Sequence, residues 1–350
     1  YEAMKYSEAI ELLKDAYTEV RGREDKSEIL FMTAESYRNI NDYDNAERYY
    51  ERALKVGYED NYAMLLRGNM FKAQGKYEEA IEVYQDYKKA EPTDSRADEA
   101  IEYARKAIDW KDKPSQYQVD LMPDINSKSA DFGVIYGGDR RENDVIVFVS
   151  MREESEGNDE DEWMAQSFAD LYTASAERKT RRRRRGNDDE EEVSYADLKW
   201  STPVPLDIED VVNTEHHEGP ATYDSRKKDL YFTRCIAEDN EQNGCGIYRS
   251  EMIGQTWRAP ERVIIGTDTT ANVGMPSLSP DDKYLYFVST DFGAKGRDIF
   301  VTTYNRREKR WENPTNLGGK VNTGDDERFP VAHGDGYLYF TSNGHPGMGG

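Results

Sequence analysis

A pattern of small and aromatic residues occurs twice in this chain, with a spacing of 34 positions. Six positions correspond between the two copies. The first copy consists of Ala34, Tyr37, Tyr43, Ala46, Tyr50 and Ala53, and the second of Gly68, Phe71, Tyr77, Ala80, Tyr84 and Tyr87. A unit of this length is too short to bury its own apolar face, so neighbouring units must stack on one another. The sequence therefore predicts a stack of paired antiparallel helices.

This order of residue types resembles the tetratricopeptide repeat (TPR), in which small residues let two helices approach and aromatic rings fill the gap to the next pair. Asn41-Asp42 and Gly75-Lys76 occupy the turns between paired helices. We expect residues 6–20 to form the second helix of a preceding repeat. Residues 95–110 should form a capping helix with Ser95 as its N-cap. The predicted helical domain covers residues 1–113.

The TPR resemblance implies that the first helix of each pair lines a concave face, which in this family commonly holds an extended peptide. The side chains expected there are Glu28, Phe31, Glu35, Arg38 and Asn39 from one repeat, and Tyr62, Leu65, Asn69 and Lys72 from the next. They include no cluster of Lys and Arg that would clamp a terminal carboxylate. A plain packing or docking surface and a peptide groove therefore both remain open.

A second and longer repeat begins after a linker at 114–126. Its strongest elements are four short apolar segments of alternating type, which predict strands. Trp257 and Trp311 are 54 positions apart, and a proline recurs at 220, 276 and 330. Four antiparallel strands in a repeated unit are typical of a propeller blade, whereas a sandwich would lack the internal repeat. We expect an α + β multidomain chain in which residues 127–350 form a β-propeller that is incomplete at its C-terminus.

The β-repeat resembles the WD40-like PD40 blades of envelope propellers such as TolB, and its last units resemble blades of OmpA-family proteins of Bacteroidota. The residues that carry the second resemblance are Trp311, Asn313, Pro314, Asn316, Leu317, Gly318, Val321, Asn322, Thr323, Glu327, Phe329, Pro330 and the segment 342–350, with a weaker copy at Trp200, Pro203, Leu206, Asn213, Thr214, Glu218 and Pro220. TPR repeats followed by such a propeller are the arrangement of PorE-like proteins of the type IX secretion system.

This resemblance implies a periplasmic protein associated with the outer membrane through a lipid anchor, whose partners are envelope and secretion-system proteins. It also implies an OmpA-like domain that grips peptidoglycan, but no residue of such a domain is in this sequence. The chain opens at Tyr1 and ends at Gly350 inside a repeat. We therefore expect an internal fragment of a longer protein.

A charged insertion at about 152–193 makes one unit of the β-repeat much longer than the others. It contains an acidic run, a run of five arginines at 181–185, and a second acidic run. Such dense blocks of charge bury little apolar area and predict a solvated loop or a contact arm for a partner. Within it, Trp163, Met164, Phe168, Leu171 and Tyr172 have helical spacing and predict a short helix.

The two cysteines, Cys235 and Cys245, are ten positions apart. They are compatible with two free thiols or with a disulfide across the tip of a hairpin. Since disulfides persist in oxidising compartments, the disulfide is favoured only if the protein is exported.

The net charge of −23 argues against nucleic acid and anionic membranes as general partners. The sequence has no apolar run long enough to cross a membrane and no catalytic, phosphate-binding or metal-binding motif. We expect no cofactor, no metal and no enzyme activity, and we interpret the chain as a structural adaptor of the secretion machinery. The alternatives are a peptide- or glycan-binding propeller, or the propeller part of a peptidase or lyase.

Overall fold

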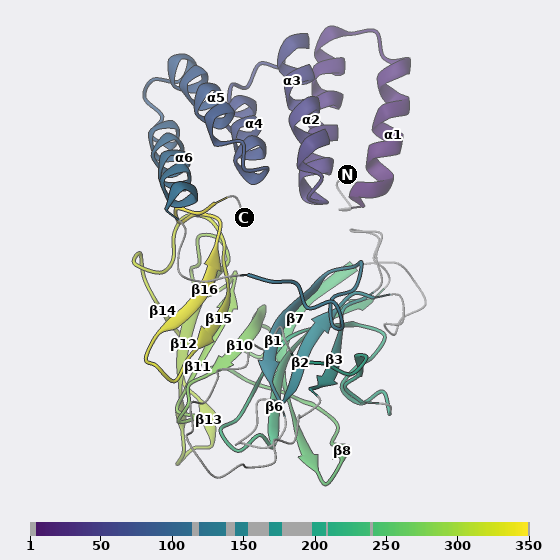
Figure 1. The fold of residues 1–350 in the computed structure, drawn as a ribbon, viewed down its shortest axis with the longest axis vertical. Coiled ribbons are helices and arrows are strands. Elements are labelled where there is room, and N and C mark those ends of the chain that lie inside the picture. Colours follow the sequence, from purple (N-terminus) through teal and green to yellow (C-terminus); the bar gives the residue numbers. More distant parts are fainter. Residues whose placement is uncertain are drawn as a thin grey trace, which may run out of the picture. The chain divides into compact units, whose positions relative to one another are not determined.

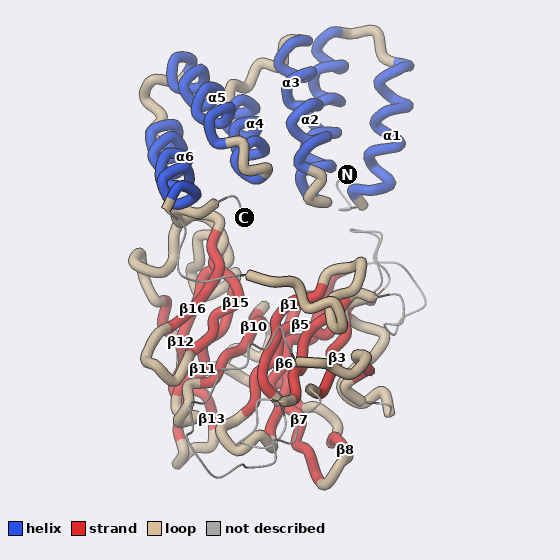
Figure 2. The backbone as a smooth tube through the Cα atoms, in the orientation of Figure 1, coloured by secondary structure: helices blue, strands red, loops and turns tan. Residues whose placement is uncertain are grey.

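A computed structural model describes residues 5–113, 119–137, 144–152, 168–176, 198–207, 209–238 and 241–348 of the protein. The chain divides into two compact units. The first contains all of the described helices, and the second contains all of the described strands. Figure 2 shows this separation by colour, with the helices in blue and the strands in red.

Six helices form the first unit (Figure 1). Each helix packs against the next one along the chain. Their bounds are α1 Tyr6–Glu19, α2 Arg23–Asn39, α3 Tyr43–Val56, α4 Tyr62–Ala73, α5 Tyr77–Ala90 and α6 Arg96–Asp112. The pairs α2–α3 and α4–α5 are the two repeats that the recurring sequence pattern predicts.

The turns inside both helix pairs have the left-handed backbone conformation that ends a helix sharply. Asn41 has a φ of 61° and Gly75, at the corresponding position of the next repeat, has a φ of 72°. Side chains at the repeated positions then pack between the helices. Ala46 and Tyr50 of the first repeat, like Ala80 and Tyr84 of the second, are fully buried. The repeated sequence pattern is therefore the pattern of interhelical packing.

The last helix has the predicted N-cap residue, but this residue does not cap through its side chain. Ser95 directly precedes α6, but its side chain makes no capping hydrogen bond. The carboxylate of Asp94 performs this role instead, because its Oδ1 accepts from the backbone N–H of Arg96 at 2.9 Å. An aspartate and a serine stand side by side here, and the longer acidic side chain reaches the free N–H.

Among the described residues of the second unit, the strands form four antiparallel sheets. The first sheet contains β1 Asp131–Tyr136, β2 Val145–Ser150, β3 Asp170–Ser175 and β4 Val204–Pro205; the second contains β5 His217–Tyr223, β6 Asp229–Glu238, β7 Glu241–Ile253, β8 Thr256–Trp257 and β9 Glu261–Arg262; the third contains β10 Val273–Leu278, β11 Tyr284–Ser289, β12 Asp298–Asn305, β13 Arg310–Trp311 and β14 Thr315–Asn316; the fourth contains β15 Glu327–Ala332 and β16 Leu338–Ser342.

The leading strands of the four sheets contact one another in succession, with β5 against both β1 and β10, and β10 against β15. This is the arrangement of propeller blades, whose first strands surround a common axis. Apolar side chains fill the space between neighbouring sheets; Leu171 and Phe232 belong to the core between the first two, and Ile247 and Phe287 to the next. The predicted fold class, TPR-like helices followed by four-stranded antiparallel blades, is confirmed.

The outermost strand of each complete blade is interrupted at a proline. In the third sheet, β13 ends at Trp311 and β14 begins at Thr315, and both pair with β12. Pro314 lies between them and has no N–H to donate, which confines it to the edge of a sheet. Trp257 and Pro260 repeat this spacing in the second sheet. The edge of this blade at Trp311 therefore consists of two short strands instead of one.

The spacing of apolar residues within 163–172 predicted a short helix. The structure describes residues 168–172 of this segment, and the prediction is wrong for them. Residues 170–175 form β3, which pairs with β2 along its whole length. Leu171 faces the core shared with the second sheet, whereas Tyr172 faces the core on the other side. Because both faces of this strand are buried, Leu171 and Tyr172 are both apolar although they are neighbours. Adjacent apolar residues also occur on the buried face of a helix, so the sequence pattern is the same. The charged runs of the insertion, at 153–167 and 177–197, lie outside the described residues.

The stretch predicted as a linker is described from residue 119 onward. It contains no helix or strand between 119 and 126. Ile125 is nevertheless buried in the core on the outer face of the first sheet, together with Ile146 and Phe148. This part of the linker therefore belongs to the sheet unit.

Candidate functional surfaces

The nine residues predicted to form a docking face lie on two helices. Five are on α2 and four are on α4, the first helices of the two repeats. Their accessibility differs widely, because Glu28 is exposed while Glu35 and Leu65 are buried. The prediction of surface positions is wrong for Glu35 and Leu65, since the second helix of each repeat packs over the first.

Glu35 is held by three neighbouring groups. Its carboxylate forms an ion pair with Arg38, at 2.6 Å between Oε2 and Nη2, and accepts a hydrogen bond from the hydroxyl of Tyr50. Its backbone carbonyl accepts from the side-chain amide of Asn39 at 2.7 Å. Burial and the adjacent carboxylate raise the pKa of Tyr50 well above its usual range, so its hydroxyl keeps its proton and donates. Glu35, Arg38 and Asn39 thus brace the repeat.

The second repeat contains an equivalent contact at the corresponding positions. The hydroxyl of Tyr84 donates to Oδ1 of Asn69 at 2.8 Å. Burial raises the pKa of Tyr84, which likewise stays a donor. In both repeats, a buried tyrosine of the second helix orients a polar side chain of the first. The repeat thereby fixes the direction of part of the predicted docking face.

The aromatic members of the predicted face are also engaged by neighbours. Phe31 stacks on Tyr58 with ring centroids 4.3 Å apart. The guanidinium of Arg96 lies 4.6 Å from the ring centroid of Tyr62. These contacts leave Glu28 as the exposed member, with Lys72 partly exposed beside the braced residues. The arrangement is a rigid surface of mixed polarity, and it suits docking of another protein better than capture of a small ligand.

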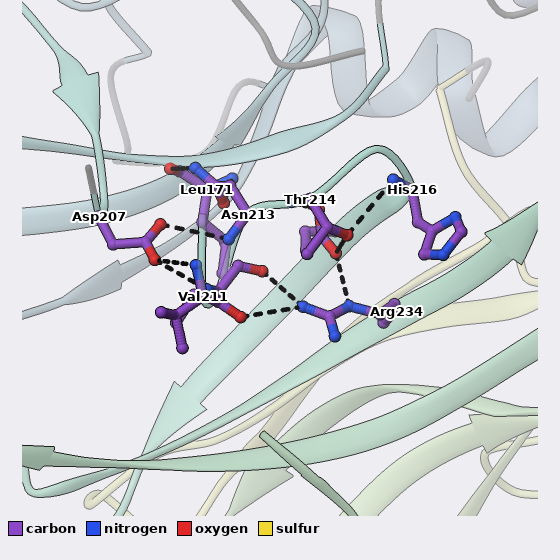
Figure 3. A network of polar contacts seen from close by, with 9 residues as sticks. Leu171, Asp207, Val211, Asn213, Thr214, His216 and Arg234 are labelled. Atoms are coloured by element: carbon purple, nitrogen blue, oxygen red, sulfur yellow. Dashed lines mark hydrogen bonds and ion pairs between the residues drawn. The ribbon is translucent and has the colours of Figure 1, made fainter. Parts of the chain in front are cut away.

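A polar network connects the first sheet to the second (Figure 3). The side-chain amide of Asn213 bonds both backbone groups of Leu171 on β3, donating to the carbonyl at 3.0 Å and accepting from the N–H at 3.0 Å. The carboxylate of Asp207 accepts from the N–H groups of Val211 and Val212 at 2.7 and 2.8 Å. The connecting segment between the sheets is therefore fixed to the edge of β3.

Glu218, near the start of β5, is the fully buried carboxyl group of this network. Its side chain accepts from the N–H and hydroxyl of Thr214 at 3.1 and 2.9 Å, and from Nε of Arg234 at 2.6 Å. Arg234 also donates to the carbonyl of Val212 at 2.8 Å. Burial raises the pKa of Glu218 to about 8. These groups bond to one another, and the network thereby positions the two sheets.

The same network recurs between the third and fourth sheets. Asn322 bonds the N–H and carbonyl of Ile299 at 2.8 and 2.9 Å. The N–H and hydroxyl of Thr323 each donate to Glu327 at 2.8 Å. Here the hydroxyl of Ser342 donates to Glu327 at 2.6 Å in the place of the arginine. The sequence indicated these residues as a recurring motif, but it carried no signal of their role, which is to join neighbouring blades.

A disulfide joins Cys235 of β6 to Cys245 of β7 in the structure. The two strands run on as a hairpin, which makes β6 ten residues long where β11 has six. The N–H of Cys245 donates to Oδ1 of Asn272 at 2.9 Å, so the hairpin also contacts the chain that leads to the third sheet. The disulfide closes the extended part of this hairpin.

Among the described residues, no group of three or more His, Cys, Asp and Glu side chains is arranged to hold a metal ion. Within the same residues, no helix is both long enough and apolar enough to cross a membrane.

Comparisons with known proteins agree with the description of the helical unit. The tetratricopeptide repeat family matches residues 31–95, which contain both repeats found from the sequence. No curated protein matches the chain. The crystal structure of TolB from Acinetobacter baumannii is similar over 42% of this chain, with 16% sequence identity and a TM-score of 0.28; the match covers 31% of the TolB chain. The propeller-like assignment therefore rests on the sheets themselves.

Proposed function

We propose that this chain is a non-catalytic adaptor that holds partner proteins of the bacterial envelope together. The observation that carries the proposal is the union of two repeat architectures in one chain, TPR helices and propeller-like blades. Both architectures present broad surfaces made by repeated units. Their buried polar residues, such as Glu35 and Glu218, are engaged in bonds between helices or between strands.

The finer assignment concerns the periplasm and the type IX secretion system. It is supported by the resemblance of the last blades to OmpA-family propellers, which includes Asn322, Thr323 and Glu327. The disulfide between Cys235 and Cys245 is compatible with an oxidising compartment. In this proposal, secretion-system proteins dock on the chain, a lipid anchor associates it with the outer membrane, and an OmpA-like domain elsewhere in the protein grips peptidoglycan.

Affinity capture from a solubilised envelope extract of a Bacteroidota species tests the adaptor function. The bait is the whole chain, and a bait with its fold disrupted by heating is the control. We expect a stable set of envelope proteins on the folded bait, including components of the secretion system. Capture of no specific protein, or turnover of a peptide or glycan substrate by the purified chain, would count against the proposal.

A further inference from the structure

The second and third sheets enclose a cleft that is distinct from the surfaces described above. Its volume is about 430 Å³, within the range of small-ligand and side-chain pockets. The wall from the second sheet includes Tyr231, Arg249 and Glu261, and the wall from the third includes Tyr304 and Trp311. Two turns border the cleft, one between β5 and β6 and the other between β10 and β11. They are joined to each other, since the N–H and the hydroxyl of Ser225 donate to Asp282 at 2.7 and 2.6 Å.

The side chains that line this cleft differ in part from those at the equivalent positions of the first sheet. Tyr231, Arg249 and Glu261 lie in one row across β6, β7 and β9. The corresponding row of the first sheet is Val147, Thr173 and Val204. There, Val147 is buried in the core against the second sheet. Arg249 and Glu261 thus stand where the first sheet has Thr173 and Val204, whereas the tyrosine recurs in the third sheet as Tyr286.

Most carboxylates of the cleft are already engaged. Asp224 accepts from the N–H groups of Lys228 and Asp229 at 2.7 and 3.0 Å. The carboxylate of Asp229 pairs with Arg249 at 2.8 Å. Asp282 accepts from Ser225, as described above. These anions stabilise turns and strands, and Asp224 also pairs with Arg226 at 3.3 Å.

The rim is cationic, although the chain as a whole carries a net charge of −23. Arg226 lies on the turn between β5 and β6, and its side chain is 64% exposed. Lys309 and Arg310 lie on the hairpin between β12 and β13, and both are exposed. Arg226 has a long contact of 3.3 Å with Asp224, and Arg310 pairs with Glu308, which does not line the cleft. This cationic rim, consisting of Arg226, Lys309 and Arg310, faces solvent.

Aromatic side chains form the interior of the cleft. Trp311 meets Tyr304 edge to face at a centroid distance of 5.0 Å, and Tyr231 at 6.4 Å. Rings of this kind favour an apolar or aromatic group from a ligand. The cleft thus combines an aromatic interior with a cationic entrance.

We propose that this cleft is a docking site for an acidic peptide segment of a partner protein, with one apolar or aromatic side chain in the cleft and carboxylates at the cationic rim. Charge complementarity with the exposed cations of the rim identifies the occupant, while Asp229 and Glu261 in the walls leave the interior to an uncharged side chain. This proposal rests on the adaptor function proposed above, because the acidic peptide is taken to belong to a partner protein that the adaptor binds.

Fluorescence anisotropy with a synthetic probe tests the site directly. The probe is a fluorescein-labelled peptide of one phenylalanine followed by four glutamates, and its control has glutamines in place of the glutamates. The test variant carries Arg226→Glu and Lys309→Glu. The control is Lys295→Glu, which reverses one charge instead of two, on an exposed residue in the loop between β11 and β12, at the opposite end of the third sheet's strands.

We expect the acidic probe to bind the unaltered chain and the Lys295→Glu variant within about two-fold of each other, and the double variant at least about ten-fold more weakly. The glutamine peptide should also bind at least about ten-fold more weakly, and added salt should weaken the acidic probe. Equal binding of the two peptides, equal losses in the test and control variants, or stronger binding of tripolyphosphate than of the peptide would overturn the proposal.

Capture from the envelope extract separates this proposal from the adaptor function. If the double variant loses one captured protein that the Lys295→Glu variant retains, both proposals are supported. If the unaltered chain and the double variant capture the same proteins in the same amounts, the cleft proposal is overturned and the adaptor function stands. If the unaltered chain captures nothing, the adaptor function fails, while the anisotropy measurement still decides whether the cleft binds acidic peptides.

Discussion

Replacing Asn213 by alanine tests whether the network between blades stabilises the sheet unit. The side chain of Asn213 is fully buried, as is Leu171, whose two backbone groups it bonds at 3.0 Å each. The Leu171 carbonyl would keep a second donor, the N–H of Leu206 at 2.8 Å. Its N–H would lose the one partner that the described residues provide. The variant therefore loses one bond that is partly replaced and leaves one buried donor unsatisfied.

These two effects set the expected magnitude. Loss of the bond to the Leu171 carbonyl, which keeps a second donor, costs about 1 kcal/mol. An unsatisfied buried N–H costs about 1–3 kcal/mol. We therefore expect Asn213→Ala to lower the free energy of unfolding of the sheet unit by about 2–4 kcal/mol. Asn322 makes the same pair of bonds with Ile299, so Asn322→Ala should give a similar loss and serves as an internal replicate.

Asn213→Asp refines the test because the aspartate side chain has the same shape as asparagine but lacks the N–H donor. The carboxylate still accepts from the Leu171 N–H, but it faces the Leu171 carbonyl with no proton to donate. Burial disfavours the charged form and raises its pKa, so protonation at lower pH restores a donor. The stability of this variant relative to the unaltered chain should improve as pH falls from about 7 to about 4, whereas the deficit of Asn213→Ala should not follow this trend.

Urea denaturation of the whole chain, followed by tryptophan fluorescence, measures these changes. Trp200, Trp257 and Trp311 are buried in the sheet unit and report on it. Circular dichroism at 222 nm follows the helical unit separately, and its transition should be unaffected by Asn213→Ala. A loss below about 0.5 kcal/mol in the fluorescence transition would refute the reasoning, because it would mean that water or a backbone shift satisfies the Leu171 N–H at little cost.

Three further predictions concern other buried groups. Burial raises the pKa of Glu218 from 4.5 to about 8, so its contribution to the free energy of unfolding is full below about pH 4.5 and is lost as pH rises towards about 8. Glu218→Gln should remove this part of the pH dependence of unfolding. An unchanged pH profile would contradict the prediction. In the helical unit, a Cβ at Gly68 would overlap a ring carbon of the buried Tyr84. Gly68→Ala should therefore lower the free energy of unfolding by about 1 kcal/mol net, because the cost of overpacking exceeds the gain in helix propensity. A more stable variant in circular dichroism melts would show that the ring moves freely. Labelling of the unreduced protein should find no free thiol at Cys235 or Cys245, and reduction should lower stability by about 3 kcal/mol for a loop of about 11 residues, whereas two reactive thiols would exclude the disulfide.

Repetition is what made much of the fold predictable from the sequence. The shorter period located both helix pairs and their turns, because the same interhelical packing demands the same small and aromatic residues in each copy. The longer period located the apolar strands of the sheets in the same way. The recurrence of tryptophan at 257 and 311 belongs to the same period, although its place at the edge of a blade was seen only in the structure.

The strand β3 was not predictable because its burial depends on two neighbours at once. Leu171 and Tyr172 point to opposite faces of a sheet whose two faces are both covered. A strand buried on both faces has no alternation of apolar and polar residues, and it therefore looks like a helix segment when charged runs surround it.

The sequence by itself determined the repeating units of this protein, since a period is a property of the chain alone. Only the tertiary structure decided which polar residues remain available to partners. Tyr50 covers Glu35, and Arg234 pairs with Glu218, because residues distant along the chain supply the bonds that burial requires. The cleft beside Arg249 was likewise set by the packing of one blade against another, which no local pattern specifies.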